Sequence, residues 1–429
     1  MKHKYTFIIA LLAVAGFVPL EVHAQDQSEV YEEIEKLKEE IKEQNKKINA
    51  NKPGKSTFLL TGFSNLTYHQ NLEDTDDSKF AHAGFSPITI WRPSERLMLE
   101  TELHIEMEGG VHGGETGDGH DGHGGHGSEN EGGHEGSTFI DLGYANMVYF
   151  LNDYMTITAG KFLTPIGNFN ERFHPSWINP LPTSPLGMGH GSPLPAAELG
   201  IQIRGGLQTG ISKLNYALYV SNGPVLEDGR GDPERAGSVV YSNFSDNNKN
   251  KALGGRLGWL PIHNSALEIA ISGQWAKNVG DEGSAYEKVG SQLVAGDISY
   301  MINSTALKGV IRIVGQYSKL MVDDAQYKND STDIANGDSE FYTFDNTSTF
   351  YYGLISYRPS KSGKKFIKNL ELAYRYDFGQ TPSDSKWEFA DARSTFGLNY
   401  WLQARSVIKL AVSIGELSNI MYLQWALGF

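Results

Sequence analysis

Cysteine is absent from this chain of 429 residues, which excludes a disulfide framework and any metal site built on thiolates. An excess of positive charge is missing as well. The formal net charge is −14, which excludes nucleic-acid binding driven by phosphate neutralisation. Beyond the N-terminal segment, no apolar run is as long as a membrane-spanning helix. The mature chain is therefore either soluble beyond the inner membrane or built as a barrel.

The N-terminal segment, residues 1–24, has the pattern of a signal peptide. Lys2 and Lys4 precede an apolar run over 7–18, and the small residue Ala24 ends the segment. The alternative, an uncleaved membrane anchor, needs about 20 apolar residues, and this run is shorter. We expect cleavage after Ala24.

Residues 25–54 have helical rather than strand periodicity. Apolar residues recur at alternating spacings of four and three, which is a heptad seam: Val30, Ile34, Leu37, Ile41 and Ile48. Only about three heptads are present, and so short a helix is marginal alone in water. We expect a periplasmic coiled-coil helix and linker, with a lone solvated helix as the alternative.

From residue 55 to 429 the apolar residues alternate with polar ones, which is the pattern of strands. Over 97–107, for example, Leu99, Leu103 and Met107 share one face, and Glu102 and His104 share the other. Such segments predict about sixteen strands: 57–70, 81–92, 96–108, 138–151, 155–167, 198–210, 212–223, 251–262, 265–277, 289–302, 305–320, 347–358, 367–379, 392–403, 405–417 and 419–429.

Long and short connections alternate between these segments, as in a barrel whose termini lie in the periplasm. The alternative is a soluble β-sandwich, but its strands usually have about 5–6 residues and its turns would not sort into two length classes. The predicted fold is all-β: a transmembrane antiparallel β-barrel of about 16 strands in the outer membrane of a Gram-negative bacterium, surrounded by lipid.

The last strand ends on an aromatic residue, with Met421, Leu423, Trp425 and Leu427 on the same face as Phe429. It resembles the C-terminal strand of outer-membrane barrels. That resemblance implies that Phe429 is the signal read by the barrel assembly machinery.

Three segments resemble the phosphate-selective porin O/P family: TAGKFLTPIGNFNE at 158–171, ELGIQIRGG at 198–206 and LNYALYVSNG at 214–223. The matching residues are Gly160, Phe162, Pro165, Gly167, Gly200, Gln202, Tyr216, Asn222 and Gly223. The resemblance implies a sixteen-stranded barrel, usually a homotrimer, whose third outer loop folds inward to narrow the pore. Residues 168–197 occupy that third position, and their six prolines stiffen them. The alternative is a loop that projects outward.

Charged residues on the polar face of the strands would line the pore and set its selectivity. The candidates at the constriction are Lys161, Arg172, Glu198, Arg204, Arg256, Arg312 and Arg375. Arg172 and Arg204 are the strongest candidates for solute contact, and most of the others have an alternative role in ion pairs that hold the wall. Because these charges are mixed in sign, the sequence predicts a general or weakly selective porin for small hydrophilic solutes rather than a phosphate channel.

The alternatives to a porin are a structural or adhesive barrel and an enzyme. A structural or adhesive barrel would use the same fold without significant conductance. An enzyme is not predicted, because no G-x-S-x-G, P-loop or dinucleotide fingerprint is present.

A histidine-rich segment over 112–134 falls in the second outer loop. Its histidines are His112, His120, His123, His126 and His134. Imidazoles and carboxylates suit Zn, Cu or Ni, but the surrounding glycines provide no fixed geometry. We expect either weak metal capture or a merely solvated low-complexity loop, and no catalytic metal.

Overall fold

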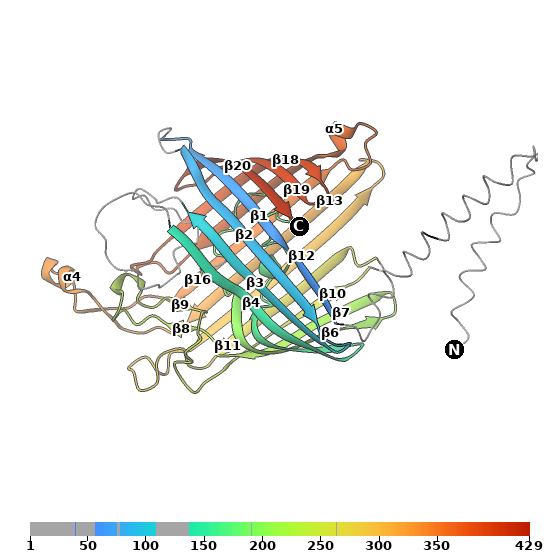
Figure 1. Ribbon diagram of the computed structural model, residues 1–429. Coiled ribbons are helices and arrows are strands. Elements are labelled where there is room, and N and C mark those ends of the chain that lie inside the picture. The colour runs from blue at the N-terminus through green and yellow to red at the C-terminus, as the bar shows by residue number, and fades with distance from the viewer. Residues whose placement is uncertain (1–38, 40–55, 75–77, 109–136, 190, 263) are drawn as a thin grey trace, which may run out of the picture. The chain divides into compact units, whose positions relative to one another are not determined.

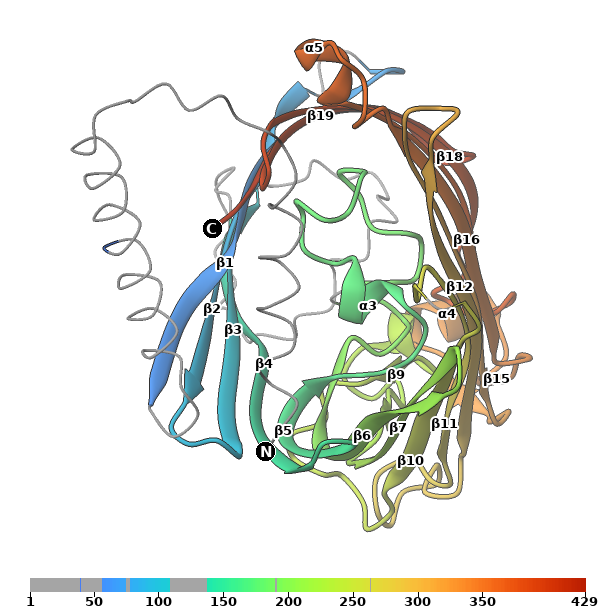
Figure 2. The same ribbon diagram turned by 90° about the vertical axis from the view of Figure 1, so that its right-hand side faces the viewer.

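The computed structural model describes residue 39 and residues 56–74, 78–108, 137–189, 191–262 and 264–429. The predicted signal peptide and coiled-coil helix, apart from residue 39, and the histidine-rich loop lie outside the described residues. Within the described ranges, sixteen antiparallel strands form one closed barrel (Figures 1 and 2). The predicted fold class is confirmed.

The barrel strands follow one another in chain order, and the numbering skips four short strands that lie in the connections. The barrel strands are β1 (Thr57–Asn71), β2 (Ser78–Arg92), β3 (Leu97–Glu108), β4 (Ser137–Asn152), β5 (Met155–Leu163), β6 (Ala197–Thr209), β7 (Ser212–Ser221), β10 (Ala252–Leu260), β11 (Leu267–Ala276), β12 (Ser291–Ser304), β13 (Gly309–Val322), β16 (Thr347–Arg358), β17 (Leu370–Gln380), β18 (Ala390–Gln403), β19 (Ser406–Ile414) and β20 (Asn419–Gly428).

The first and last strands pair with each other and close the barrel. Their register runs from Phe63 opposite Gly428 to Asn71 opposite Ile420. The backbone N–H of Phe429 donates to the carbonyl of Gly62 at 3.0 Å, so the C-terminal residue belongs to the seam. Closure removes the exposed edges that an open sheet would present.

Two strand boundaries differ from the prediction by four residues, more than any other boundary. β5 ends at Leu163 rather than at residue 167, because the chain leaves the sheet at the Pro165–Gly167 turn. β13 begins at Gly309 rather than at residue 305, because Lys308 adopts a φ of 51° in a turn. Lys308 is therefore exposed in a turn and does not belong to the strand.

The two faces of the barrel wall differ in polarity. Outward-facing Leu218 and Ile271 are 65% and 66% exposed, whereas inward-facing Glu102 and Arg375 are fully buried. Trp259 and Trp275 lie near the C-terminal ends of β10 and β11. Because these strands are antiparallel, the two residues lie near opposite ends of the barrel, and both are about half exposed. An apolar outer band with aromatic residues near both ends matches the hydrocarbon and interfacial zones of a membrane.

The connections at one end of the barrel are long and contain additional short elements. They hold α3 (Phe169–Arg172), β8 (Val225–Leu226), η1 (Pro233–Arg235), β9 (Val239–Val240), β14 (Tyr327–Lys328), α4 (Ser331–Asn336) and β15 (Phe341–Tyr342), whereas α5 (Lys365–Lys368) lies at the other end (Figure 1). None of the helices in the described ranges has both the length and the hydropathy of a membrane-spanning helix.

Replacing the outward-facing Ile271 with arginine tests the lipid-facing assignment. We expect Ile271→Arg to lower the free energy of unfolding in lipid vesicles by about 2–4 kcal/mol, the cost of an arginine near the bilayer midplane. Ile271→Leu, which keeps the apolar surface, should change it by less than about 1.5 kcal/mol. Urea unfolding followed by tryptophan fluorescence measures both, and equal stability of the two variants would contradict the assignment.

Candidate functional site

The segment over 164–196, between β5 and β6, lies inside the barrel. Figure 2 shows α3 and the chain that follows it within the ring of strands. We call this segment the inner loop. Hydrogen bonds join it to the inward faces of β11, β13 and β16–β20, on the far side of the barrel from β5.

The inner loop turns into the lumen at Gly167. This residue has a φ of 66°, and a Cβ there would lie 2.1 Å from the Gln316 side chain, so only glycine fits. Its N–H donates to Ser272 Oγ at 2.9 Å. The N–H of Asn168 donates to Gln316 Oε1 at 2.9 Å, and the hydroxyl of Tyr352 donates to Asn168 Oδ1 at 2.7 Å. The loop therefore enters the lumen directly from the end of β5.

A buried charge cluster on β17 and β18 holds the middle of the inner loop. Asp377 accepts from Arg375 at 2.8 Å and from Arg393 at 2.9 Å. Arg375 also donates to the carbonyl of Thr183 at 2.7 Å, and both arginines donate to the carbonyl of Ser184, at 2.9 and 3.0 Å. These loop carbonyls are buried away from water, so the guanidinium groups supply the donors that water would otherwise provide.

A second set of polar side chains holds the preceding part of the inner loop. Lys409, only 1% exposed, donates to the carbonyls of Ser176 and Leu181. Asn399 Nδ2 donates to the carbonyl of Pro180 at 2.8 Å. Arg312 donates to the carbonyl of Ile178 at 3.3 Å and lies over the ring of Phe173.

A third cluster fixes α3 at the start of the loop. Arg172 forms a two-point pair with Glu268: Nη1 donates to Oε2, and Nη2 donates to Oε1 at 2.9 Å. Arg256 pairs with Asp297 at 2.8 Å and with Glu268 at 3.3 Å, and it donates to the carbonyl of Gly167 at 2.9 Å. Alternating arginines and carboxylates therefore connect α3 to β10, β11 and β12.

Several residues proposed from the sequence for the constriction serve these clusters instead of facing open space. Arg256 and Arg375 are 7% and 0% exposed, and Glu198, at 2%, accepts from Ser221 and Gln274. Lys161 lies in register with Leu199, and its Nζ is 3.6 Å from Asp141. Arg256 and Arg375 join the wall to the loop, whereas the contacts of Glu198 and Lys161 lie within the wall.

Arg172 and Arg204 are brought together at a polar cavity of about 290 Å³ between α3 and the β3–β6 wall. Arg204 reaches across to Glu171 of α3 at 3.0 Å. The side chains of Arg172 and Arg204 are 36% and 44% exposed, so both are accessible to solvent. The residues that line this cavity, which we call the polar cavity, are Glu100, Tyr144, Asn146, Leu163, Glu171, Arg172 and Arg204.

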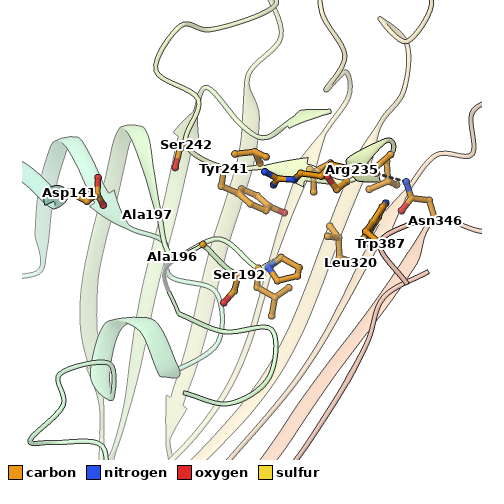
Figure 3. A pocket seen from close by; sticks show the side chains of 18 of the residues that line it. Asp141, Ser192, Ala196, Ala197, Arg235, Tyr241, Ser242, Leu320, Asn346 and Trp387 are labelled. Atoms are coloured by element: carbon orange, nitrogen blue, oxygen red, sulfur yellow. Dashed lines mark hydrogen bonds between the residues drawn. The ribbon is translucent and has the colours of Figure 1, made fainter. Parts of the chain in front are cut away.

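A second cavity of about 180 Å³ lies toward the long-connection end, between the last part of the inner loop and the β9 region (Figure 3). Arg235, Tyr241 and Trp387 line it together with Ser192. Burial raises the pKa of Tyr241 well above its ordinary value, so its hydroxyl stays protonated. This cavity has both polar and aromatic walls.

A contact between His174 of the inner loop and β3 was not anticipated from the sequence. His174 Nε2 lies 3.5 Å from Glu102 Oε1, and His104 Nε2 lies 4.0 Å from the same oxygen. The alternation of β3 placed Glu102 and His104 on the lumenal face, but no local pattern connects His174 to them. The position of the loop brings these groups together.

The metal-binding prediction concerns residues outside the described part of the chain, so it stays a prediction. Across the described ranges, no group of three His, Asp or Glu side chains is arranged to hold a metal ion. Phe429 stacks on Phe85 with ring centroids 5.6 Å apart, and its assembly role likewise stays a prediction.

Neutralising Asp377 tests whether the charge cluster holds the inner loop. Asp377→Asn leaves two buried guanidinium groups without a carboxylate, which should lower the free energy of unfolding by about 3–5 kcal/mol. It should also make the loop more susceptible to protease. The matched control is Asp384→Asn, on an exposed turn. Urea unfolding and limited proteolysis measure both effects, and an Asp377→Asn protein that behaves like the control would refute the anchoring role.

Comparison with known proteins identifies the fold. No protein-family model matches the chain, and no curated protein does. Among solved structures, the chain is similar to OmpF of Salmonella typhi in complex with daunomycin, with a TM-score of 0.51, 11% identity, and coverage of 87% of this chain and 97% of that one. It is also similar to the outer membrane channel DcaP of Acinetobacter baumannii, with a TM-score of 0.50, 10% identity, and coverage of 87% and 98%. At such low identity, these likenesses show a shared barrel fold.

Proposed function

We propose that this protein is an outer-membrane porin for the passive diffusion of small hydrophilic solutes. The observation that carries the proposal is the polar cavity, which lies inside a closed barrel with an apolar exterior. The space beside the inner loop is a polar cavity rather than an apolar plug. Interior polarity together with an apolar outer band is the arrangement of water-filled barrels.

The inner loop is proposed as the constriction. Its backbone is held at several separate points on the wall, from Gly167 near β11 to Ser184 near β18. A constriction requires such fixed placement, because a freely moving loop would not define an opening. The alternative function is a purely structural or adhesive barrel. Such a barrel has no need for exposed charged side chains in its lumen, such as Arg204, which faces α3.

We propose no phosphate selectivity. A phosphate filter needs cationic donors that are free to replace the hydration shell of the anion. Arg256, Arg375 and Lys409 are buried and already donate to carboxylates or loop carbonyls. The remaining cationic groups at the polar cavity are each paired with a carboxylate.

The assembly and location follow from the same proposal. We propose a homotrimer in the outer membrane of a Gram-negative bacterium, inserted by the barrel assembly machinery through its C-terminal strand. Metal capture by the histidine-rich loop over 112–134 would be an additional property of the outer surface and not part of the passage.

A tryptophan placed in the polar cavity tests the route of diffusion. We expect Asn146→Trp to reduce single-channel conductance in planar bilayers at least two-fold, because Asn146 lines the cavity and a larger ring would fill it. The control is the adjacent Met147→Trp, which points outward at 55% exposure and should leave conductance unchanged. Wild-type protein that folds but never conducts would overturn the porin assignment. Equal conductance of the two variants would place the passage elsewhere.

A further inference from the structure

We infer that the passage prefers small hydrated cations over anions. This inference rests on the proposed porin function and specifies its class of solute. It comes from how the lumenal charges are partnered, which the sequence alone does not show.

The arginines of the polar cavity are neutralised by carboxylates. Arg204 lies 3.0 Å from Glu171, and Arg172 forms its two-point pair with Glu268. Two positive and two negative charges therefore cancel around α3. Neither arginine is left to attract an anion without competition.

Glu100 lines the same cavity from β3 and has a different environment. Within the described ranges it accepts no hydrogen bond and has no Lys, Arg or His nitrogen within 4.0 Å. Arg204 acts on it only at longer range, since the guanidinium is bound to Glu171. The opening thus carries one carboxylate in excess of its paired charges.

Further carboxylates continue along the lumenal face of β3 toward the long-connection end. Glu102 contacts two histidines, at 3.5 and 4.0 Å, and Glu106 lies 3.8 Å from His104 with its side chain 25% exposed. Glu100, Glu102 and Glu106 thus place three carboxyl groups on the lumenal face of β3.

Four cationic side chains of the opposite wall are shielded from a passing solute by their burial. Arg256, Arg375, Arg393 and Lys409 are between 0% and 7% exposed. Their donors are directed to Asp297, Asp377 and the carbonyls of the inner loop. Because the loop lies between them and the open part of the lumen, a passing ion meets the β3 carboxylates first. Carboxylates lining a pore favour cations.

The test is the zero-current potential of full-length protein in planar bilayers across a tenfold KCl gradient at pH 8. We expect the wild type to pass K⁺ more readily than Cl⁻. Glu100→Gln should reduce the permeability ratio at least two-fold, and Glu100→Lys should reduce it further or reverse it. Glu106→Gln provides a second, independent neutralisation of the same acidic face and should act in the same direction.

The control is Asp338→Asn, which makes the same change of charge at an exposed position after α4. Its permeability ratio should equal that of the wild type. An open wild-type channel with no preference or with anion preference would overturn this inference but leave the porin function intact. The inference also fails if Glu100→Gln and Glu106→Gln conduct with the wild-type ratio. Absence of conductance in the wild type would instead overturn the porin function itself.

Discussion

The hydrogen bonds from lumenal side chains to the backbone of the inner loop are the interactions on which the rest of the structure depends. Where the loop packs against the barrel wall, its carbonyl groups are buried away from water, and each needs a donor. Arg375, Arg393 and Lys409 supply those donors at the carbonyls of residues 176, 181, 183 and 184. Without these donors, the loop would have a higher free energy inside the barrel than exposed to solvent, because its buried carbonyls would have no hydrogen bonds.

This arrangement also determines which charges a solute meets. Buried cations need compensation, and Asp377 and Asp297 provide it beside the guanidinium groups. The cationic side chains of the wall are thus engaged in the hydrogen bonds that hold the loop. What remains accessible lies on the opposite side, where Arg204 and Glu171 pair and Glu100 has no ion-pair partner in the described ranges. Placement of the loop and electrostatics of the passage are therefore consequences of the same contacts.

The barrel itself was predictable from the sequence because its physical cause is local. Alternation along each strand reports which face meets lipid, so the sixteen strands and the polar side of β3 followed from residues such as Leu103 and Glu102. Errors arose where alternation continued into a turn, as at Lys308, whose positive φ no periodicity reveals. The seam between β1 and β20 likewise followed from an even strand count.

The candidate site was only partly predictable, because its partners are distant in the chain. Arg172 and Arg204, the predicted candidates for solute contact, both line the polar cavity, but the contact of Arg375 with Thr183 joins residues separated by 192 positions. Strand periodicity places Arg375 in the lumen, but it does not show that the guanidinium donates to a carbonyl of the inner loop. The role of His174 was missed for the same reason, since its contact with Glu102 depends on the path of the whole loop.

The most direct measurement of the central claim is a disulfide between the inner loop and the wall. The natural chain has no cysteine, so an introduced pair has no competing thiol. A Cβ at Gly379 of β17 would lie 3.0 Å from the Cβ of Leu186, close enough for a disulfide after a small adjustment. The double variant Leu186→Cys, Gly379→Cys should form this bond in the membrane-inserted protein, seen by mass spectrometry, and still conduct. Pairing Leu186→Cys with the outward-facing Tyr376→Cys should give none. If the first pair stays reduced under oxidising conditions, the loop does not lie against the lumenal wall and the account is contradicted.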